Sequence, residues 1–191
     1  IRSLNFGYTK ELRDKRVTYV NALATFTGSH TINLSNPATS TNRDVTARRV
    51  LSAVGGRPTL MDCPGGDLAS TSDDVFSLDK SPGKTLVVGA SYIALECAGF
   101  LAGLGLDVTV MVRSILLRGF DRDIANKIGE DMEANHGVKF LRECVVSKME
   151  KSSSGQITVD WKSTNGASSS GTAVFDTVLA AIGRHADTTK L

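Results

Sequence analysis

The pattern of apolar and polar positions is clearest between residues 84 and 118, where two apolar runs enclose an amphipathic stretch. The first run, at 84–89, is typical of a short buried strand and ends at Gly89. Helix-forming residues follow at 91–105, and the second run covers 107–112. This order predicts a βαβ unit with a right-handed crossover between two parallel strands.

Further elements are expected on both sides of this unit. Toward the C-terminus the pattern predicts a helix with Asp121 as its N-cap and Gly137 as its stop, followed by an antiparallel meander. Toward the N-terminus, alternation over 17–35 predicts a β-hairpin with T-G-S-H as its turn. The remaining expected elements are a polar loop at 36–44, a strand at 47–54, a helix at 121–135, strands near 138–141, 144–150, 156–162 and 174–182, and Ser/Gly-rich loops at 152–155 and 163–171. The chain is therefore expected to be α/β, with a division near residue 75.

The turn between the first strand and the helix consists of small residues. It departs from the dinucleotide-binding pattern G-x-G-x-x-G/A, because Ser91 takes the second glycine position and Ala94 the third. Small side chains at Gly89, Ala90 and Ser91 would still let a pyrophosphate approach the helix N-terminus, whose amides favour negative charge. Ser91 still permits this approach if its φ stays negative, and its hydroxyl can cap the helix by accepting from an amide two or three residues on.

Positive charge follows the second strand directly. An NAD site carries an acidic residue near this point, which would repel a 2′-phosphate, whereas Arg113, Ser114 and Arg118 offer two cations and a hydroxyl to that phosphate. A lone βαβ pattern is often only structural, and arginines after a strand often form a solvated edge. The turn, the spacing and the charge together favour NADP(H) over NAD(H).

Composition argues against several classes of function but does not indicate a functional site. The chain has 41% hydrophobic and 22% charged residues and a net charge of +2, which are ordinary globular values. The basic residues are dispersed, which argues against nucleic-acid binding, and no apolar run approaches the ~18 residues of a membrane span. The spacing of Cys63, Cys97 and Cys144 excludes a C-x-x-C pair, and the histidines lack ligand neighbours, so we expect no metal site.

Several motifs together resemble one family. G-A-S-Y-I-A-L-E-C-A-G-F-L followed by D-V-T-V-M-V-R-S-I-L-L-R-G-F-D closely resembles the NADPH domain of the animal-type thioredoxin reductases, including the thioredoxin glutathione reductases. These are pyridine nucleotide-disulfide oxidoreductases. V-G-G-R-P at 54–58, T-S-D-D-V-F-S-L at 71–78 and A-I-G-R at 181–184 are similar to further family segments, in the family's order.

The resemblance implies a Rossmann-like NADPH-binding domain with an antiparallel β-meander at 76–191, preceded by the C-terminal part of an FAD-binding domain at 1–75. In the family, NADPH passes a hydride to FAD and electrons then reach a redox disulfide and thioredoxin. Tyr92 is expected to cover the flavin until nicotinamide enters, and Glu96 to hold the carboxamide end of the nicotinamide. The NADPH contacts so implied are Gly89, Ala90, Ser91, Tyr92, Ile93, Glu96, Arg113, Ser114, Arg118, Ile182, Gly183 and Arg184, and the FAD contacts are Ala24 and Gly55.

Other parts of the family's machinery are not found in this sequence. The flavin-site G-x-G-x-x-G, the C-x-x-x-x-C pair and the dimer domain are missing, so the chain is expected to be an inactive piece of a larger homodimeric flavoenzyme without catalytic residues of its own. Thioredoxin, glutathione and glutaredoxin remain open as acceptors, and cytoplasm and mitochondria as compartments. The alternatives are a binding-only NADP(H) module, a glutathione reductase, or an NADH oxidase, against which the two arginines argue.

Overall fold

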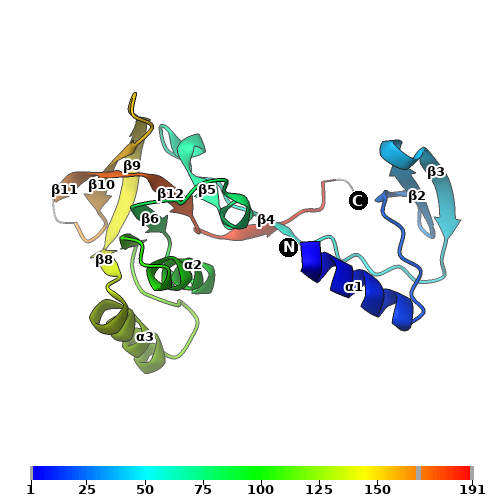
Figure 1. Ribbon diagram of the computed structural model, residues 1–191, viewed down its shortest axis with the longest axis horizontal. Coiled ribbons are helices and arrows are strands. Elements are labelled where there is room, and N and C mark those ends of the chain that lie inside the picture. The colour runs from blue at the N-terminus through cyan, green and yellow to red at the C-terminus, as the bar shows by residue number, and fades with distance from the viewer. Residues whose placement is uncertain (1, 167–168, 190–191) are drawn as a thin grey trace. The chain divides into compact units, whose positions relative to one another are not determined.

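The computed structural model describes residues 2–166 and 169–189 and divides into two compact units (Figure 1). The first unit comprises the residues up to Gly55 and those from Asp187, and the second runs from Gly56 to Ala186. The assignment of a flavin part and an NADPH part that meet near residue 75 stays a prediction. Within the described residues, no helix combines the length and apolar character that crossing a bilayer requires.

The first unit contains one helix and a three-stranded antiparallel sheet. Helix α1 (Arg2–Asp14) was not expected, because the sequence has no capping residue that indicates its start. Its apolar side chains are largely exposed in the structure. The hairpin prediction is confirmed by β1 (Leu23–Gly28) and β2 (Thr31–Asn36), which reverse within the T-G-S-H segment. Its first strand is shorter than expected, because residues 17–22 are not in a strand.

Two predictions for this unit are wrong. The polar loop at 36–44 contains the 3₁₀ turn η1 (Pro37–Thr39) and most of β3 (Thr41–Thr46), which pairs with β2. Polar side chains hold this strand, since Asn33 Nδ2 donates to Asn42 Oδ1 at 3.0 Å and to Asp44 Oδ1 at 2.8 Å. The strand expected at 47–54 does not form, and the apolar side chain of Leu51 in that segment is 90% exposed.

A five-stranded parallel sheet forms the centre of the second unit, in the order β5-β12-β6-β7-β8. The predicted βαβ unit is confirmed as β6, α2 and β7, and the predicted second helix as α3. Asp121 caps α3 by accepting from the Ile124 N–H at 3.0 Å, and Gly137 ends it with φ 67°. The bounds are β5 (Ser70–Thr71), β6 (Thr85–Val88), α2 (Tyr92–Gly103), β7 (Val108–Val112), α3 (Arg122–His136), β8 (Lys139–Arg142) and β12 (Thr177–Ala180).

Alternation along the strands separates two layers of core. Val87 and Val110 pack with buried residues of α2 and α3 on one face of the parallel sheet. Leu86 and Met111 pack on the other face against the antiparallel sheet β9 (Cys144–Lys151), β10 (Ile157–Ser163) and β11 (Ser170–Phe175). Figure 1 shows the two helices together on one side of β6 and β8. The result is three layers: helices, parallel sheet and antiparallel sheet.

The meander prediction needs two corrections. The strand expected at 138–141 belongs to the parallel sheet as β8, because it pairs with β7. The strand expected at 174–182 is two strands, since the chain breaks between β11 and β12 at Asp176, which accepts from the Lys84 N–H at 2.8 Å. The loop expected at 163–171 is shorter, because β10 includes Ser163 and β11 begins at Ser170. Residues 167 and 168 of that loop lie outside the described residues.

A two-stranded ribbon completes the second unit. β4 (Gly56–Pro58) pairs antiparallel with β13 (Arg184–Ala186), so the first and last residues of the unit are neighbours. Two 3₁₀ turns, η2 (Gly66–Leu68) and η3 (Val75–Ser77), lie between β4 and β6.

Candidate functional site

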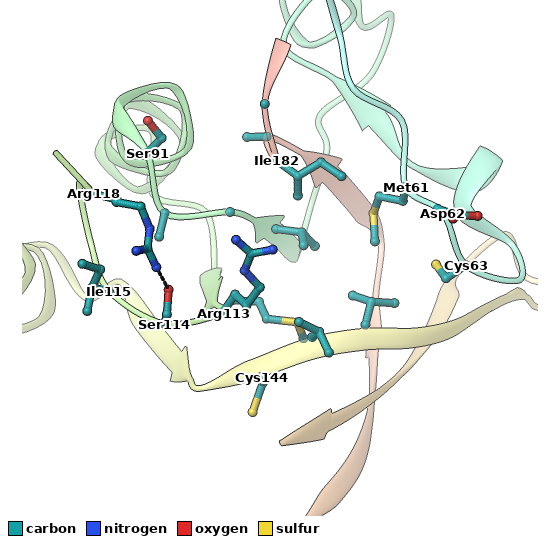
Figure 2. A pocket seen from close by; sticks show the side chains of 18 residues that line it. Met61, Asp62, Cys63, Ser91, Arg113, Ser114, Ile115, Arg118, Cys144 and Ile182 are labelled. Carbon is teal, nitrogen blue, oxygen red and sulfur yellow. Dashed lines mark hydrogen bonds between the residues drawn. The ribbon is translucent and has the colours of Figure 1, made fainter. Parts of the chain in front are cut away.

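A pocket of about 540 Å³ opens at the carboxyl ends of β6, β7 and β12, within the second unit (Figure 2). This is the edge at which open parallel sheets bind ligands. Four groups of residues line the pocket: Met61–Cys63, Val88–Ser91 with Ala181–Gly183, Met111 with Arg113–Ile115 and Arg118, and Cys144–Val146.

The turn after β6 packs closely against the backbone that follows β12. Gly89 has φ 129°, and a Cβ added there would collide with the carbonyl oxygen of Ala181. Its N–H donates to Met111 O at 3.0 Å, and the Ala181 N–H donates to Val88 O at 2.8 Å. Glycine is thus required sterically and conformationally at this position.

Ser91 is the N-cap of α2 through its backbone alone. Its φ of −86° meets the condition for close approach, and its carbonyl accepts from the Leu95 N–H at 3.1 Å. The expected capping hydrogen bond from the side chain is wrong, because the Ser91 hydroxyl accepts no amide of the first turn. The first-turn N–H groups, which have no partner inside a helix, are therefore not satisfied by Ser91.

The expected phosphate-binding side chains meet at the same pocket. Arg113, Ser114 and Arg118 are all exposed and line it together with the Gly89 turn. Arg118 Nη2 donates to Ser114 Oγ at 2.8 Å, and Figure 2 shows both arginine side chains extending into the same region. The structure thus joins the small-residue turn and the positive charge, which are separated in sequence by a whole helix.

Two hydrogen bonds fix the backbone that carries these arginines. The Leu117 N–H donates to Ala90 O at 2.7 Å and ties the segment to the turn. Thr164 Oγ1, from the connection after β10, donates to Arg113 O at 2.8 Å. The loop at the end of β7 is therefore held from both sides of the sheet edge.

The other expected NADPH contacts are distributed differently. Ile182 and Gly183 line the pocket, and Gly183 has φ 138°. Tyr92 is 52% exposed at the start of α2 and Glu96 is exposed one turn on, whereas Ile93 packs against the hydrophobic core. None of these three side chains is among the residues lining the pocket in the described part of the chain.

Arg184 lies in β13, and its guanidinium group forms hydrogen bonds with other residues of the chain. Its Nη1 donates to Asp73 Oδ1 at 3.0 Å and to Ser72 Oγ at 3.3 Å, and its Nη2 donates to Gly56 O at 2.5 Å. These bonds join the two-stranded ribbon to the segment before η3. Ala24 and Gly55, the expected FAD contacts, belong to the first unit.

Sequence reasoning missed the opposite wall of the pocket, which includes Cys63 and Cys144. Burial, and then the neighbouring Asp62 carboxylate, raise the pKa of the Cys63 thiol. Burial and then Glu143 raise the pKa of Cys144, whose Sγ donates to Arg142 O at 3.2 Å. Both thiols are favoured in the protonated form, which is unreactive compared with a thiolate. No local sequence signal marks this wall, because it is formed by long-range packing.

Comparison with known proteins places the chain in a family. The family model for pyridine nucleotide-disulphide oxidoreductases matches residues 1–191. Thioredoxin reductase 2, mitochondrial, from Drosophila melanogaster and thioredoxin reductase SEP1 from Emiliania huxleyi are each 48% identical over 185 residues, or 96% of this chain. The chain spans 36% and 37% of the length of these relatives. With a match along its whole length, the chain belongs to the pyridine nucleotide-disulphide oxidoreductase family.

Proposed function

We propose that the pocket binds NADPH and that the chain is the NADPH-binding part of an FAD-dependent thioredoxin-disulfide reductase. The observation that carries the proposal is the meeting of the Gly89–Ser91 turn with Arg113, Ser114 and Arg118 in one pocket. The first feature suits a pyrophosphate and the second a 2′-phosphate. Both relatives named above are thioredoxin reductases, which supports the reaction class.

The pocket offers a place for each phosphate of the dinucleotide. The pyrophosphate would lie over the Gly89 turn, where a Cβ is excluded and the N-terminus of α2 supplies backbone donors. The 2′-phosphate would take the guanidinium groups of Arg113 and Arg118 and the hydroxyl of Ser114. The existing Arg118–Ser114 hydrogen bond already brings two of these donors together.

The arrangement of strands supports a Rossmann-like fold for the second unit. β12, β6, β7 and β8 are parallel neighbours, and α2 crosses from β6 to β7. A dinucleotide across the carboxyl ends of these strands would reach Ile182 and Gly183 with one end. NADPH bound there supplies a hydride for FAD, with Tyr92 and Glu96 beside the nicotinamide end and Arg184 near the flavin boundary.

The rest of the proposed enzyme is inferred from the family. Ala24 and Gly55 would contribute only backbone contacts to FAD, whose remaining contacts would come from other segments. Thioredoxin is the proposed acceptor because both relatives are thioredoxin reductases, and glutathione or glutaredoxin is the second choice. We propose a homodimer in the cytoplasm or the mitochondrion, the latter being the compartment in one relative's name.

The decisive experiment compares NADPH and NADH in the intact protein. We expect bound flavin with yellow absorbance, bleaching of that flavin by NADPH, and NADPH oxidation that depends on oxidised thioredoxin. NADPH binding without flavin and without turnover would instead identify a binding-only module. Equal affinity for the two nucleotides would remove the 2′-phosphate assignment.

A further inference from the structure

Arg122 is the first residue of α3, and its side chain turns back over the loop that follows β7. Its Nη2 donates to Leu116 O at 2.7 Å and to Leu117 O at 2.9 Å. The side chain is half-buried and Arg122 is not among the residues that line the pocket. A positive charge at a helix N-terminus opposes the helix dipole, so this position is unfavourable for arginine unless the side chain has another interaction.

The segment that Arg122 holds has an unusual backbone. Leu117 has φ 45°, the left-handed region that side chains other than glycine rarely adopt. Such a conformation persists only where surrounding contacts impose it. The hydrogen bonds that hold this conformation are Leu117 N–H to Ala90 O at 2.7 Å, Phe120 N–H to Leu117 O at 3.0 Å, and the two bonds from Arg122.

Leu117 lies between two parts of the proposed phosphate site. Its N–H is bonded to the small-residue turn, and the next residue, Arg118, reaches into the pocket. Buried Leu116 and Leu117 side chains anchor the loop in the core below. Leu116 also contacts α3 closely, since a Cβ added at Gly129 would collide with Leu116 Cδ1. Arg122 thus fixes the backbone on which the direction of Arg118 depends.

We propose that Arg122 is a positioning residue for recognition of the 2′-phosphate, and that the preference for NADPH over NADH depends on it. The inference rests on the proposed function of the pocket. Without the guanidinium, the Leu116 and Leu117 carbonyls lose their charge-assisted partner and the loop gains other backbone states. NADPH must then order the loop on binding, whereas NADH, which has no 2′-phosphate, does not engage it.

The test measures dissociation constants for NADPH and NADH on the intact protein, for the wild type and Arg122→Ala. We expect NADPH affinity to fall about tenfold, equivalent to about 1.4 kcal/mol, and NADH affinity to change less than about twofold. Amide hydrogen exchange should rise at Leu117 and stay unchanged in β6 and β7. An NADPH-to-NADH ratio equal to that of the wild type overturns the proposal, whatever happens to thermal stability.

Two further variants separate positioning from charge and from loss of fold. Lys127→Ala removes an exposed cation from the same helix and should leave the ratio unchanged. If it lowers the ratio as much as Arg122→Ala, net charge is the cause and positioning is excluded. If Arg122→Ala does not fold, Arg122→Gln takes its place, because the shorter, uncharged glutamine side chain cannot replace the Nη2 donor to the two carbonyls. Its ratio should also fall, and a wild-type ratio overturns the proposal.

The outcomes also separate this inference from the function on which it rests. If the wild-type protein shows no preference for NADPH, both the proposed 2′-phosphate site and the role of Arg122 are wrong. A wild-type protein that prefers NADPH, loses the preference in Arg113→Ala and keeps it in Arg122→Ala removes only the role of Arg122.

Discussion

Thr164 Oγ1 donates a hydrogen bond to the carbonyl oxygen of Arg113 at 2.8 Å, and so links the antiparallel sheet to the end of β7. The same residue donates its N–H to Glu143 O at 2.7 Å. Because Arg113 begins the loop that carries the positive charge, a residue far away in sequence supports the proposed phosphate site.

Thr164→Val tests this link, since it removes the hydroxyl and keeps the shape of the side chain. We expect NADPH to bind two- to fivefold more weakly and stability to fall by about 1 kcal/mol or less, the net value of one such hydrogen bond. Isothermal titration and urea unfolding measure the two effects. Thr172→Val removes a hydroxyl on β11 that donates to Asp160 Oδ1 on β10, so it is the matched control and should leave NADPH affinity intact.

Arg113→Ala should weaken NADPH binding about 10- to 100-fold, because one charge-assisted pair to a phosphate contributes about 1.5–3 kcal/mol. NADH binding should change little. Titration of the intact protein with both nucleotides at fixed ionic strength checks the prediction. Lys151→Ala removes an exposed cation from β9 and controls for net charge. Equal losses for the two nucleotides would contradict the assignment of Arg113 to the 2′-phosphate.

Gly89→Ala should lower the free energy of unfolding by about 2–4 kcal/mol, from overpacking against the Ala181 carbonyl and from a positive φ that alanine disfavours. Nucleotide binding should be lost in any protein that still folds. Gly99→Ala is the control within α2, where an added Cβ meets nothing within 4 Å. It should stabilise by about 0.5–1 kcal/mol through helix propensity. Urea unfolding of both variants decides the matter.

Stability should fall in acid as two carboxylates are protonated. Hydrogen bonds from the Thr71 hydroxyl and N–H lower the pKa of Asp74, and bonds from Gln156 and the Lys84 N–H lower the pKa of Asp176. A carboxyl whose pKa is lower when folded stabilises the protein above its unfolded pKa, and that contribution is lost as pH falls through the folded value. The loss should therefore occur below about pH 4.

The double variant Asp74→Asn, Asp176→Asn should show a shallower decline of stability between pH 4 and lower values, because neither amide titrates. Urea midpoints measured across this pH range supply the comparison. Asp79→Asn, which removes another exposed carboxylate from the second unit, should leave the slope closer to that of the wild type. A double variant with the wild-type slope would rule out these two groups as the cause.

Tyr92→Ala should alter the rate at which NADPH reduces flavin in the intact protein more than it alters stability. The side chain is 52% exposed, so its removal should cost within about 0.5 kcal/mol. Stopped-flow absorbance of the flavin measures the rate. Leu104→Ala, at the other end of α2 and 75% exposed, is the control. An unchanged rate of flavin reduction would end the proposed gating role.

Local signals in the sequence predicted the parts of the fold that depend on local physics. The buried runs of β6 and β7 read as strands, and Asp121 and Gly137 marked the ends of α3 through a side-chain cap and a left-handed residue. The turn and the arginines could be assigned to one site because a βαβ crossover brings the ends of neighbouring parallel strands together.

Features that depend on distant partners could not be predicted in this way. β3 is polar and gains its stability from Asn33 and the backbone of β2. The wall formed by Met61–Cys63 is placed by packing of the following glycines, and by the Met149 N–H, which donates to Pro64 O at 2.8 Å. Ser91 differs in the other direction. Serine is a common helix cap, but here its hydroxyl forms no capping hydrogen bond.

The ribbon formed by β4 and β13 determines how the second unit is connected to the chain. Gly56 is the register partner of Ala186, so the polypeptide enters and leaves the unit at adjacent points. Just outside, the Asp187 N–H donates to Gly55 O at 3.1 Å. The unit therefore has the topology of an inserted domain whose two ends are paired with each other. Adjacent ends of this kind are the arrangement in which insertion of a whole domain into a chain is tolerated.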